Sequence, residues 1–260
     1  NLSYAPRLWK VSTAESAISI LSERSFDLII IMLRISDMNP IRLSKKIKKK
    51  YPDKPIVLLV FDESELNLIS SNYLKNIDNI FIWSGNANVF TAIIKYIEDK
   101  NNVHRDTIEG DVRSIIVIED TPRYYSSILP MLYKIIVYHT NELINKSLND
   151  TQKLLHLRKR PKILLAKNYE DAISYFDKYR DNLLGIISDI RFPKANKKDS
   201  KAGILFSEYA QVKDEGIPII LQTTDISIEH STKNITDLLL NKNSSTLYYD
   251  LRELIIKNFG

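Results

Sequence analysis

The sequence predicts an α/β protein with two doubly wound parallel sheets, one in each half of the chain. Short β-branched runs alternate strictly with segments of helical periodicity, which is typical of a parallel sheet covered by helices on both faces. The runs at 115–118 and 217–221 are apolar almost throughout, as strands buried on both sides must be. Because the alternation occurs twice, we interpret the halves as an internal duplication.

The first half is predicted to begin within the repeating pattern, without its first strand and helix. We expect strands at 8–11, 26–33, 55–60 and 80–83, and helices at 13–23, 40–50, 65–75 and 89–99. The polar stretch that follows is a natural linker. The predicted organisation is therefore a domain at 1–100, a linker at 101–112 and a second domain at 113–260.

The second half contains the complete pattern of five strands. We expect strands at 114–119, 162–166, 183–188, 217–222 and 237–241, and helices at about 124–158, 169–180, 203–214, about 227–235 and 245–258. Residues 190–202 are predicted to form a loop.

The helix that starts near Tyr124 is unusually long for such a sheet. At about 35 residues it would extend roughly 50 Å. Its apolar stripe continues beyond His139, so we expect a dimer contact or docking against residues 1–100 to bury it. The alternative is two helices interrupted near residues 145–150. The stripe consists of Leu143, Ile144, Leu148 and Leu155.

Composition limits the classes of function. The chain of 260 residues is long enough for two domains, and it has no cysteine, which excludes disulfides, thiol catalysis and Cys-ligated zinc. No apolar run approaches the roughly 20 residues that span a bilayer, and there is no signal-peptide pattern. We therefore expect a cytoplasmic protein with no membrane partner.

Basic residues cluster at 45–46, 48–50, 158–160 and 194–201. We interpret these clusters as solvated surface, and expect no nucleic-acid partner, because no concentrated basic stripe on a recognisable module accompanies them.

Polar side chains follow the apolar strands of the second half where each strand ends. Glu119 and Asp120 end the first strand, Asp189 the third, Thr223 the fourth, and Lys242 follows the fifth. The carboxyl ends of parallel strands meet in one crevice, so these side chains should share a pocket. The set is suited to binding Mg²⁺ and to accepting a phosphoryl group on an aspartate. Thr224 is an alternative to Thr223, although the spacing from Pro218 favours Thr223.

Residues 114–258 resemble a response-regulator receiver domain. The marks of that family are an acidic pair, Asp-x-x-Met/Phe-Pro, Thr or Ser, and Lys after successive strands. Here they are Glu119-Asp120, Asp189-Ile-Arg-Phe-Pro193, Thr223 and Lys242. The resemblance implies a five-stranded, flavodoxin-like sheet in each half, the first lacking its initial strand and helix.

Two positions depart from the family pattern. Asn243 replaces the proline that usually follows the lysine, and Leu239 replaces the usual switch aromatic. Leu239 lacks the aromatic ring that the Thr–aromatic signalling linkage of the family uses.

The resemblance assigns a role to each site residue. Mg²⁺ would be held by Glu119, Asp120, Asp189 and the backbone carbonyl of Arg191. Asp189 would be the phosphoacceptor, with the Lys242 ammonium and the Thr223 hydroxyl contacting the phosphoryl group.

Nearly the whole chain resembles the N-terminal region of large Bacteroidetes proteins related to phosphoenolpyruvate synthase or pyruvate,phosphate dikinase. The segments that carry this likeness are 83–86, 93–100, 118–130, 160–166, 184–193 and 256–260. The catalytic part of such a protein would follow Gly260. The chain itself would then not be an enzyme beyond its own phosphorylation.

The first half lacks the acceptor chemistry. Alignment of the third strands puts Met32 at the nucleophile position, Val60 at the hydroxyl position and Ser84 near the lysine position. Asp37 and Asp62 are nearby acids, but both fall beyond the strand ends. We interpret this half as a pseudo-receiver with a packing or partner-binding role.

The leading hypothesis is a phospho-switch that receives a phosphoryl group from a histidine kinase or a small phosphodonor and regulates an attached C-terminal output domain. The alternative is a receiver-like scaffold that is never phosphorylated and holds a homodimer or another partner. An aspartate-nucleophile phosphatase of the haloacid-dehalogenase type would need Asp-x-Asp on the first strand, which is absent here. A cofactor-binding flavodoxin would need a phosphate-cradling glycine loop, and the chain has only six glycines.

Overall fold

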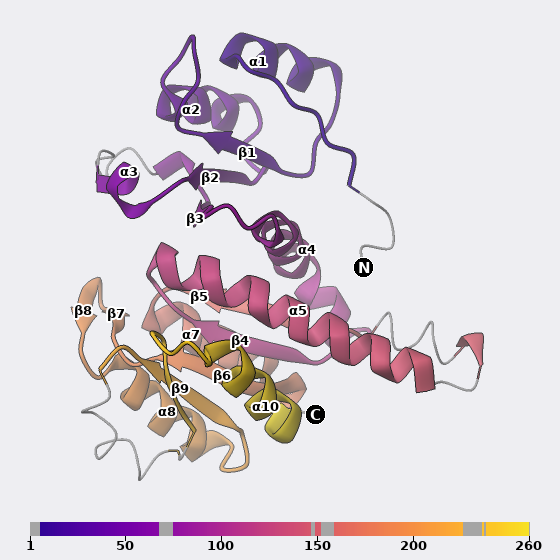
Figure 1. The fold of residues 1–260 in the computed structure, drawn as a ribbon, viewed down its shortest axis with the longest axis vertical. Helices are drawn as coiled ribbons and strands as arrows, with labels where there is room; N and C mark the ends of the chain where they lie inside the picture. Colours follow the sequence, from indigo (N-terminus) through magenta and orange to yellow (C-terminus); the bar gives the residue numbers. More distant parts are fainter. Residues whose placement is uncertain are drawn as a thin grey trace. The chain divides into compact units, whose positions relative to one another are not determined.

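The computed structural model describes residues 6–67, 75–146, 149–151, 159–225, 236 and 238–259 (Figure 1). The chain divides into two compact units, Asn1–Ile97 and Glu98–Gly260. Each unit contains a parallel β-sheet, of three strands in the first and five in the second. The α/β class is therefore confirmed, and the parallel sheets are compatible with a flavodoxin-like fold. No helix in the described part of the chain is both long and apolar enough to cross a membrane.

The first unit has a small parallel sheet in the order β1-β2-β3. Its elements are α1 (Ala14–Glu23), β1 (Ile29–Met32), α2 (Pro40–Lys50), β2 (Ile56–Val60), α3 (Glu63–Asn67), β3 (Asn79–Ile82) and α4 (Asn88–Ile108), the last of which continues into the second unit. Every residue of the central strand β2 is buried, and α1 and α2 pack on one face of the sheet through Ala14, Leu43 and Ile47.

Two predictions for the first unit need correction or remain open. Residues 8–11 form no strand, and Leu8 and Trp9 are 82% and 50% exposed, so the predicted extra strand is wrong. Four residues can form a strand only by pairing with a sheet edge, because an unpaired strand leaves its backbone groups unsatisfied. Most of the predicted helix at 65–75 lies outside the described residues.

The second unit contains a five-stranded parallel sheet in the order β10-β9-β6-β4-β5. Its strands are β4 (Ser114–Ile118), β5 (Lys162–Ala166), β6 (Leu183–Asp189), β9 (Ile219–Thr223) and β10 (Leu239–Asn241). The helices in its described part are α5 (Pro122–Lys146), α7 (Tyr169–Tyr179), the 3₁₀ turn η2 (Arg180–Asn182), α8 (Ala202–Lys213) and α10 (Leu247–Phe259), together with the last turns of α4. Both β5 and β6 pair with β4, so the strand order reverses at β4. Such a reversal is the point at which open α/β sheets bind ligands.

Helices cover both faces of this sheet, as the apolar strands predict. On one face α7 and α8 pack through Phe176 and Phe206, whose rings lie 6.1 Å apart. On the other face α5 and α10 lie side by side (Figure 1). The helix predicted at about 227–235 lies outside the described residues.

The predicted linker at 101–112 is largely helical, because α4 continues to Ile108. Val103 and Thr107 in this polar-looking segment are buried, and Val103 belongs to the core of the second unit. Asp99 is fully buried and is held by the hydroxyl of Tyr133 at 3.0 Å, the amide of Ile163 at 2.9 Å and the guanidinium of Arg160. The final turns of α4 are therefore a structural part of the second unit.

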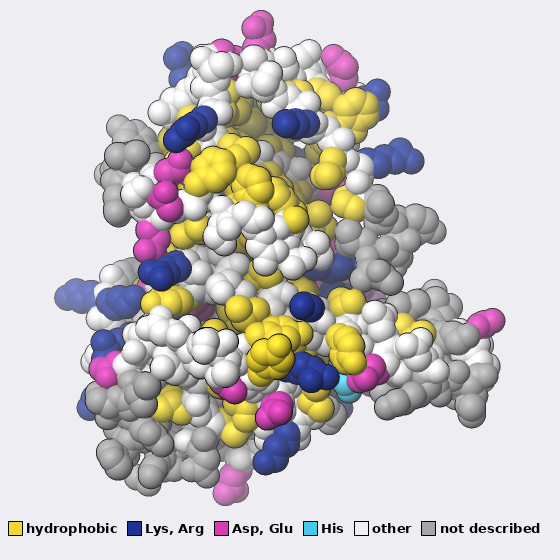
Figure 2. Space-filling view, in the orientation of Figure 1, with side chains coloured by type: hydrophobic (Ala, Val, Ile, Leu, Met, Phe, Trp, Pro, Cys, Tyr) yellow, Lys and Arg dark blue, Asp and Glu magenta, His cyan; other side chains and the backbone are white. Residues whose placement is uncertain are grey.

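The long helix of the second unit is shorter than predicted. α5 ends at Lys146, and Asn149 lies in a bend, so no continuous helix reaches residue 158. The interruption predicted near residues 145–150 is therefore confirmed, while most of the second helix of that alternative lies outside the described residues. The stripe residues Leu148 and Leu155, and the side chain of Leu143, lie outside what the structure describes. Hydrophobic side chains gather over α5 and α10 on the face shown in Figure 2. Tyr138 on α5 and Ile256 on α10 are among the exposed large hydrophobic residues.

The segment predicted as a loop at 190–202 contains an antiparallel hairpin. Its strands are β7 (Phe192–Lys194) and β8 (Lys197–Asp199). The two residues between them, Ala195 and Asn196, have φ angles of 50° and 62°. Positive φ at both central residues is the mark of a type I′ turn, which matches the twist of the paired strands.

Candidate metal centre

The strand register of the second unit brings the ends of four strands to one level. Ile118 lies opposite Ser188, and Asp189 lies opposite Gln222. Thr223 lies opposite Asn241. The residues that end or follow β4, β6, β9 and β10 therefore meet at one edge of the sheet, beside the reversal at β4.

Three carboxylates converge at this edge. Glu119, Asp120 and Asp189 each place an oxygen within 4.8 Å of the other two. Glu119 is 2% exposed and Asp189 is 9% exposed, while Asp120 is partly buried. Clustered carboxylates repel one another, and a bound cation relieves that repulsion. The cluster could therefore hold a metal ion.

Lys242 neutralises part of this charge from the end of β10. Its Nζ donates to Glu119 Oε2 and lies 3.0 Å from Asp189 Oδ2. The backbone N–H of Lys242 donates to the Thr223 carbonyl at 2.9 Å, which fixes where the side chain leaves the sheet. Its ammonium also lies 4.4 Å from the centre of the Tyr124 ring on α5, within cation–π range. A single buried ammonium thus bridges two acids that come from different strands.

Burial governs the ionisation of Glu119. It raises the pKa of Glu119 to about 7; Lys242 lowers this pKa and Asp189 raises it further. Two hydrogen bonds favour the ionised form, one from Lys242 and one from the amide of Thr121 at 3.1 Å. Glu119 therefore exchanges its proton near neutral pH, in the range where loss of that proton would accompany cation binding.

The structure places Thr223 and Arg191 near the edge but gives them other partners. The buried Thr223 hydroxyl donates to the Asp225 carbonyl at 3.2 Å and accepts from the Asp225 amide at 3.0 Å. Thr224 is exposed, so Thr223 is the buried member of the pair. The Arg191 guanidinium lies 3.1 Å from the Asp225 carboxylate. The printed ion pairs at the site therefore form two sets: Lys242 contacts Glu119 and Asp189, and Lys198 contacts Asp120.

Lys198 is a site residue that the sequence did not reveal. It lies on β8, and its Nζ is 3.2 Å and 3.4 Å from the two carboxylate oxygens of Asp120. The sequence showed only a run of lysines in a predicted loop. The turn is formed by Ala-Asn instead of the Asn-Gly or Asp-Gly that signals a hairpin.

Gly203 is a second missed residue, and it packs against the end of the strand that carries Asp189. A Cβ at this position would lie 2.2 Å from the Asp189 carbonyl oxygen and 2.8 Å from Ile190 Cα. The amide of Gly203 donates to the Ile190 carbonyl at 3.0 Å. The first turn of α8 therefore packs directly on the backbone that presents Asp189.

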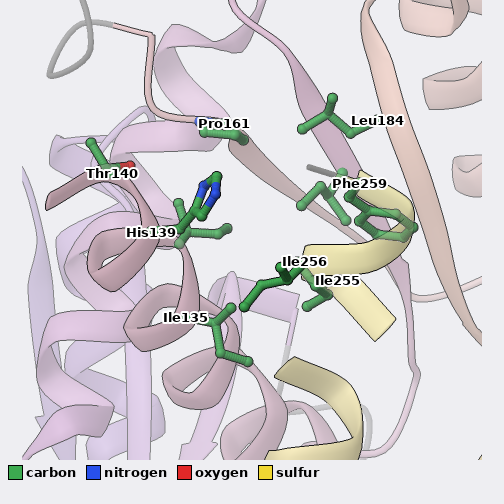
Figure 3. Close-up of a pocket in the computed structure, with 10 residues that line it drawn as sticks. Ile135, His139, Thr140, Pro161, Leu184, Ile255, Ile256 and Phe259 are labelled. Atoms are coloured by element: carbon green, nitrogen blue, oxygen red, sulfur yellow. The ribbon is translucent and has the colours of Figure 1, made fainter. Parts of the chain in front are cut away.

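The second unit also has a small apolar cavity at the opposite end of its sheet. It has a volume of about 40 Å³ and lies between α5 and α10, near the start of β6 (Figure 3). The His139 ring points towards Pro161, while the rest of the lining is mainly aliphatic. A cavity of this size has room for a few water molecules. It is separate from the acidic cluster and offers no converging charged groups.

The corresponding edge of the first unit is apolar. Met32 ends β1 and Val60 ends β2, and Trp83 follows β3 with its ring 5.6 Å from those of both Phe61 and Phe90.

The nearby acids of the first unit cap helices. Asp37 accepts from the amides of Ala14 and Glu15 at 2.7 Å and 3.0 Å, and Asp62 accepts from the amide of Glu65. These backbone hydrogen bonds lower the pKa of Asp37, and a bond from Ser64 with that from Glu65 lowers the pKa of Asp62. Both carboxylates therefore accept hydrogen bonds at helix N-termini, Asp37 at the start of α1 and Asp62 at the start of α3.

Comparison of the chain with protein-family models and with curated proteins finds no match. Function is therefore inferred from the geometry of the acidic cluster and from the order of the strands that form it.

Proposed function

We propose that the second unit is a receiver-type phosphoacceptor module in which Asp189 accepts a phosphoryl group in the presence of Mg²⁺. The observation that carries this proposal is the Lys242 ammonium held between Glu119 and Asp189 beside the strand reversal. A buried cation adjoining a carboxylate and a candidate metal cluster is the equipment that phosphoryl transfer needs, since catalysis there is mainly positioning and charge stabilisation.

Each group has a defined task in this proposal. An oxygen of Asp189 attacks phosphorus and an acyl phosphate forms on Asp189. The bond that breaks joins phosphorus to the leaving atom of the donor, which is an imidazole nitrogen of a phosphohistidine or an oxygen of a small acyl phosphate. Glu119, Asp120, Asp189 and the Arg191 carbonyl would hold Mg²⁺, which prefers oxygen ligands and supplies charge neutralisation when bound. Lys242 would pair with the transferred phosphoryl group as a compact point charge. The Thr223 hydroxyl would exchange its Asp225 contacts for a phosphoryl oxygen.

The first unit is, in this proposal, a degenerate receiver without acceptor chemistry. Its support is the parallel sheet whose strand ends carry Met32 and Val60 in place of polar groups. The donor would be a histidine kinase or a small acyl phosphate, and the output would be a phosphoenolpyruvate synthase-like region attached after the second unit.

Beryllofluoride binding tests the proposal, because this complex occupies a phosphoacceptor carboxylate as a mimic of the phosphoryl group. We expect the 260-residue chain to bind it with Mg²⁺ by fluorine NMR, and to gain one phosphoryl group from acetyl phosphate by intact-mass spectrometry. Asp189→Asn should abolish both signals. Asp181→Asn is the matched control, since Asp181 is 88% exposed in the turn before the opposite end of the same strand.

Two results would contradict the proposal. Undiminished beryllofluoride binding in Asp189→Asn would place the acceptor elsewhere. Binding of neither beryllofluoride nor Mg²⁺ by the unaltered chain would favour the scaffold alternative, in which the acidic cluster is a structural charge network neutralised by lysines.

A further inference from the structure

The hairpin β7–β8 is firmly attached to the second unit. Phe192, at its base, is fully buried in the core between the sheet and helices α7 and α8. At its tip the Ala195 amide donates to Glu170 Oε1 at 2.9 Å, and the Lys194 ammonium lies 4.5 Å from the centre of the Tyr169 ring. Both partners lie in the first turn of α7. The hairpin is therefore an arm fixed at both ends, and its lysines occupy set positions relative to the sheet.

Alternation along β8 separates the neighbouring lysines. Successive residues of a strand point to opposite sides, so Lys197 and Lys198 leave the hairpin in opposite directions. The Lys198 side chain extends to Asp120, 78 residues earlier in the chain, and its ammonium lies within 3.4 Å of both carboxylate oxygens. The hairpin therefore places the ammonium of Lys198 at the acidic cluster and directs the Lys197 side chain away from it.

The charges at the cluster show what Lys198 does there. With Glu119, Asp120 and Asp189 ionised, Lys242 neutralises one charge and Lys198 a second. A divalent ion at Asp120 would replace the single positive charge of Lys198 with two. Together with the positive charge of Lys242, it would neutralise all three carboxylates. Lys198 already contacts both oxygens that Asp120 could offer, and its positive charge would repel an incoming cation. Lys198 and the metal therefore require the same carboxylate.

We propose that Lys198 is a tethered competitor of the divalent cation at Asp120, so that the cation binds only as this ammonium swings away. The inference rests on the proposed metal site of the second unit. The hairpin holds the ammonium at an effective concentration in roughly the millimolar range. The Lys198 side chain is itself 58% exposed, so it can withdraw into water while the hairpin stays in place. Competition from Lys198 lowers the affinity of the site for the cation. A higher cation concentration is therefore needed to occupy it.

A set of three variants of the full chain tests this competition, with Mg²⁺ affinity measured by isothermal titration calorimetry. Lys198→Met keeps the length of the side chain and removes the charge, and should tighten Mg²⁺ binding about two- to fivefold, in line with loss of an exposed ion pair. Lys198→Arg keeps the charge and should retain the original affinity within about twofold. Lys197→Met removes the same charge from the adjacent residue and should also leave the affinity within about twofold.

The sign of the change separates competition from a supporting role. A lysine that only stabilised the site would make Lys198→Met bind Mg²⁺ more weakly, and that result or an unchanged affinity would overturn the inference. Equal tightening in Lys197→Met would also overturn it, because the effect would then be one of net charge. Loss of beryllofluoride binding in Asp189→Asn, with no effect of Lys198, would leave the proposed function standing and remove only the competition.

Discussion

The residues at the ends of the parallel strands are charged in the second unit and apolar in the first. In the second unit the strand ends carry acids and a lysine, with Lys242 placed 3.0 Å from Asp189. In the first unit they carry Met32 and Val60, followed by the contact between Trp83 and Phe61. The strand scaffold is similar, because both sheets are parallel and built from apolar runs. The comparison teaches that the sheet determines where a site can form, while a few residues beyond the strand ends determine whether one does.

The acids near the strand ends of the first unit make the same point. Asp37 and Asp62 accept backbone hydrogen bonds at the starts of α1 and α3. In the second unit Asp120 and Asp189 stand beside other carboxylates within 4.8 Å. An acid that accepts backbone hydrogen bonds at a helix terminus is an ordinary cap, whereas clustered acids are stabilised by a cation or by protonation of one of them.

The largest expected effect is on stability, and it comes from replacing Lys242, which lies at the strand ends of the second unit. Lys242→Met should lower the free energy of unfolding by about 3–5 kcal/mol without Mg²⁺, because it leaves buried acids without their cation. Added Mg²⁺ should restore part of that stability by binding the cluster. Denaturant titration with and without Mg²⁺ measures both effects. A loss below about 1 kcal/mol would show that Lys242 is not held between two ionised acids.

Glu119 provides a second test, through pH. Its pKa is raised to about 7 by burial, so below pH 7 a proton must leave before a cation can bind. Mg²⁺ affinity should fall up to about tenfold for each pH unit below 7 and level off above it. Calorimetry between about pH 6 and pH 8 measures this slope, which Glu119→Gln should remove. A flat profile in the unaltered chain would show that Glu119 does not control binding.

The smallest effect is expected from an attempt to give the first unit an acceptor. Met32→Asp should change the free energy of unfolding by about 1 kcal/mol or less, because Met32 is 37% exposed at the end of β1. It should add no Mg²⁺ or beryllofluoride binding when Asp189 is also changed to Asn. Binding in that double variant would mean that a lone aspartate at a strand end is sufficient, and the contrast between the units would fail.

The strand ends of the second unit were predictable because apolar strands and their first polar residues are local signals. Glu119, Asp120, Asp189 and Lys242 were predicted to share a pocket, and their side chains do lie together. Thr223 was placed correctly at the end of β9, although its hydroxyl bonds to Asp225. The chemistry assigned to these residues stays a prediction until it is measured.

Other features depended on contacts distant in sequence. The β7–β8 hairpin closes through Ala195 in a left-handed conformation, which alanine seldom adopts and which no local pattern signals. The helical state of residues 101–108 depends on burial of Val103 and Thr107. The stretch looked like a linker because its remaining residues are polar. Residues 8–11 have strand-like composition but form no strand in the structure.

The burial of Asp99 changes where the second unit can be separated from the rest of the chain. A recombinant fragment that starts at Arg113, as the sequence suggests, would lose the acceptor for the Tyr133 hydroxyl, the Ile163 amide and the Arg160 guanidinium. Orphaned buried donors cost about 1–3 kcal/mol each, and more when charged, which is a large part of the stability of a small domain. Fragment design and protease mapping should therefore treat the last turns of α4 as belonging to the domain, with the cut placed before Asp99.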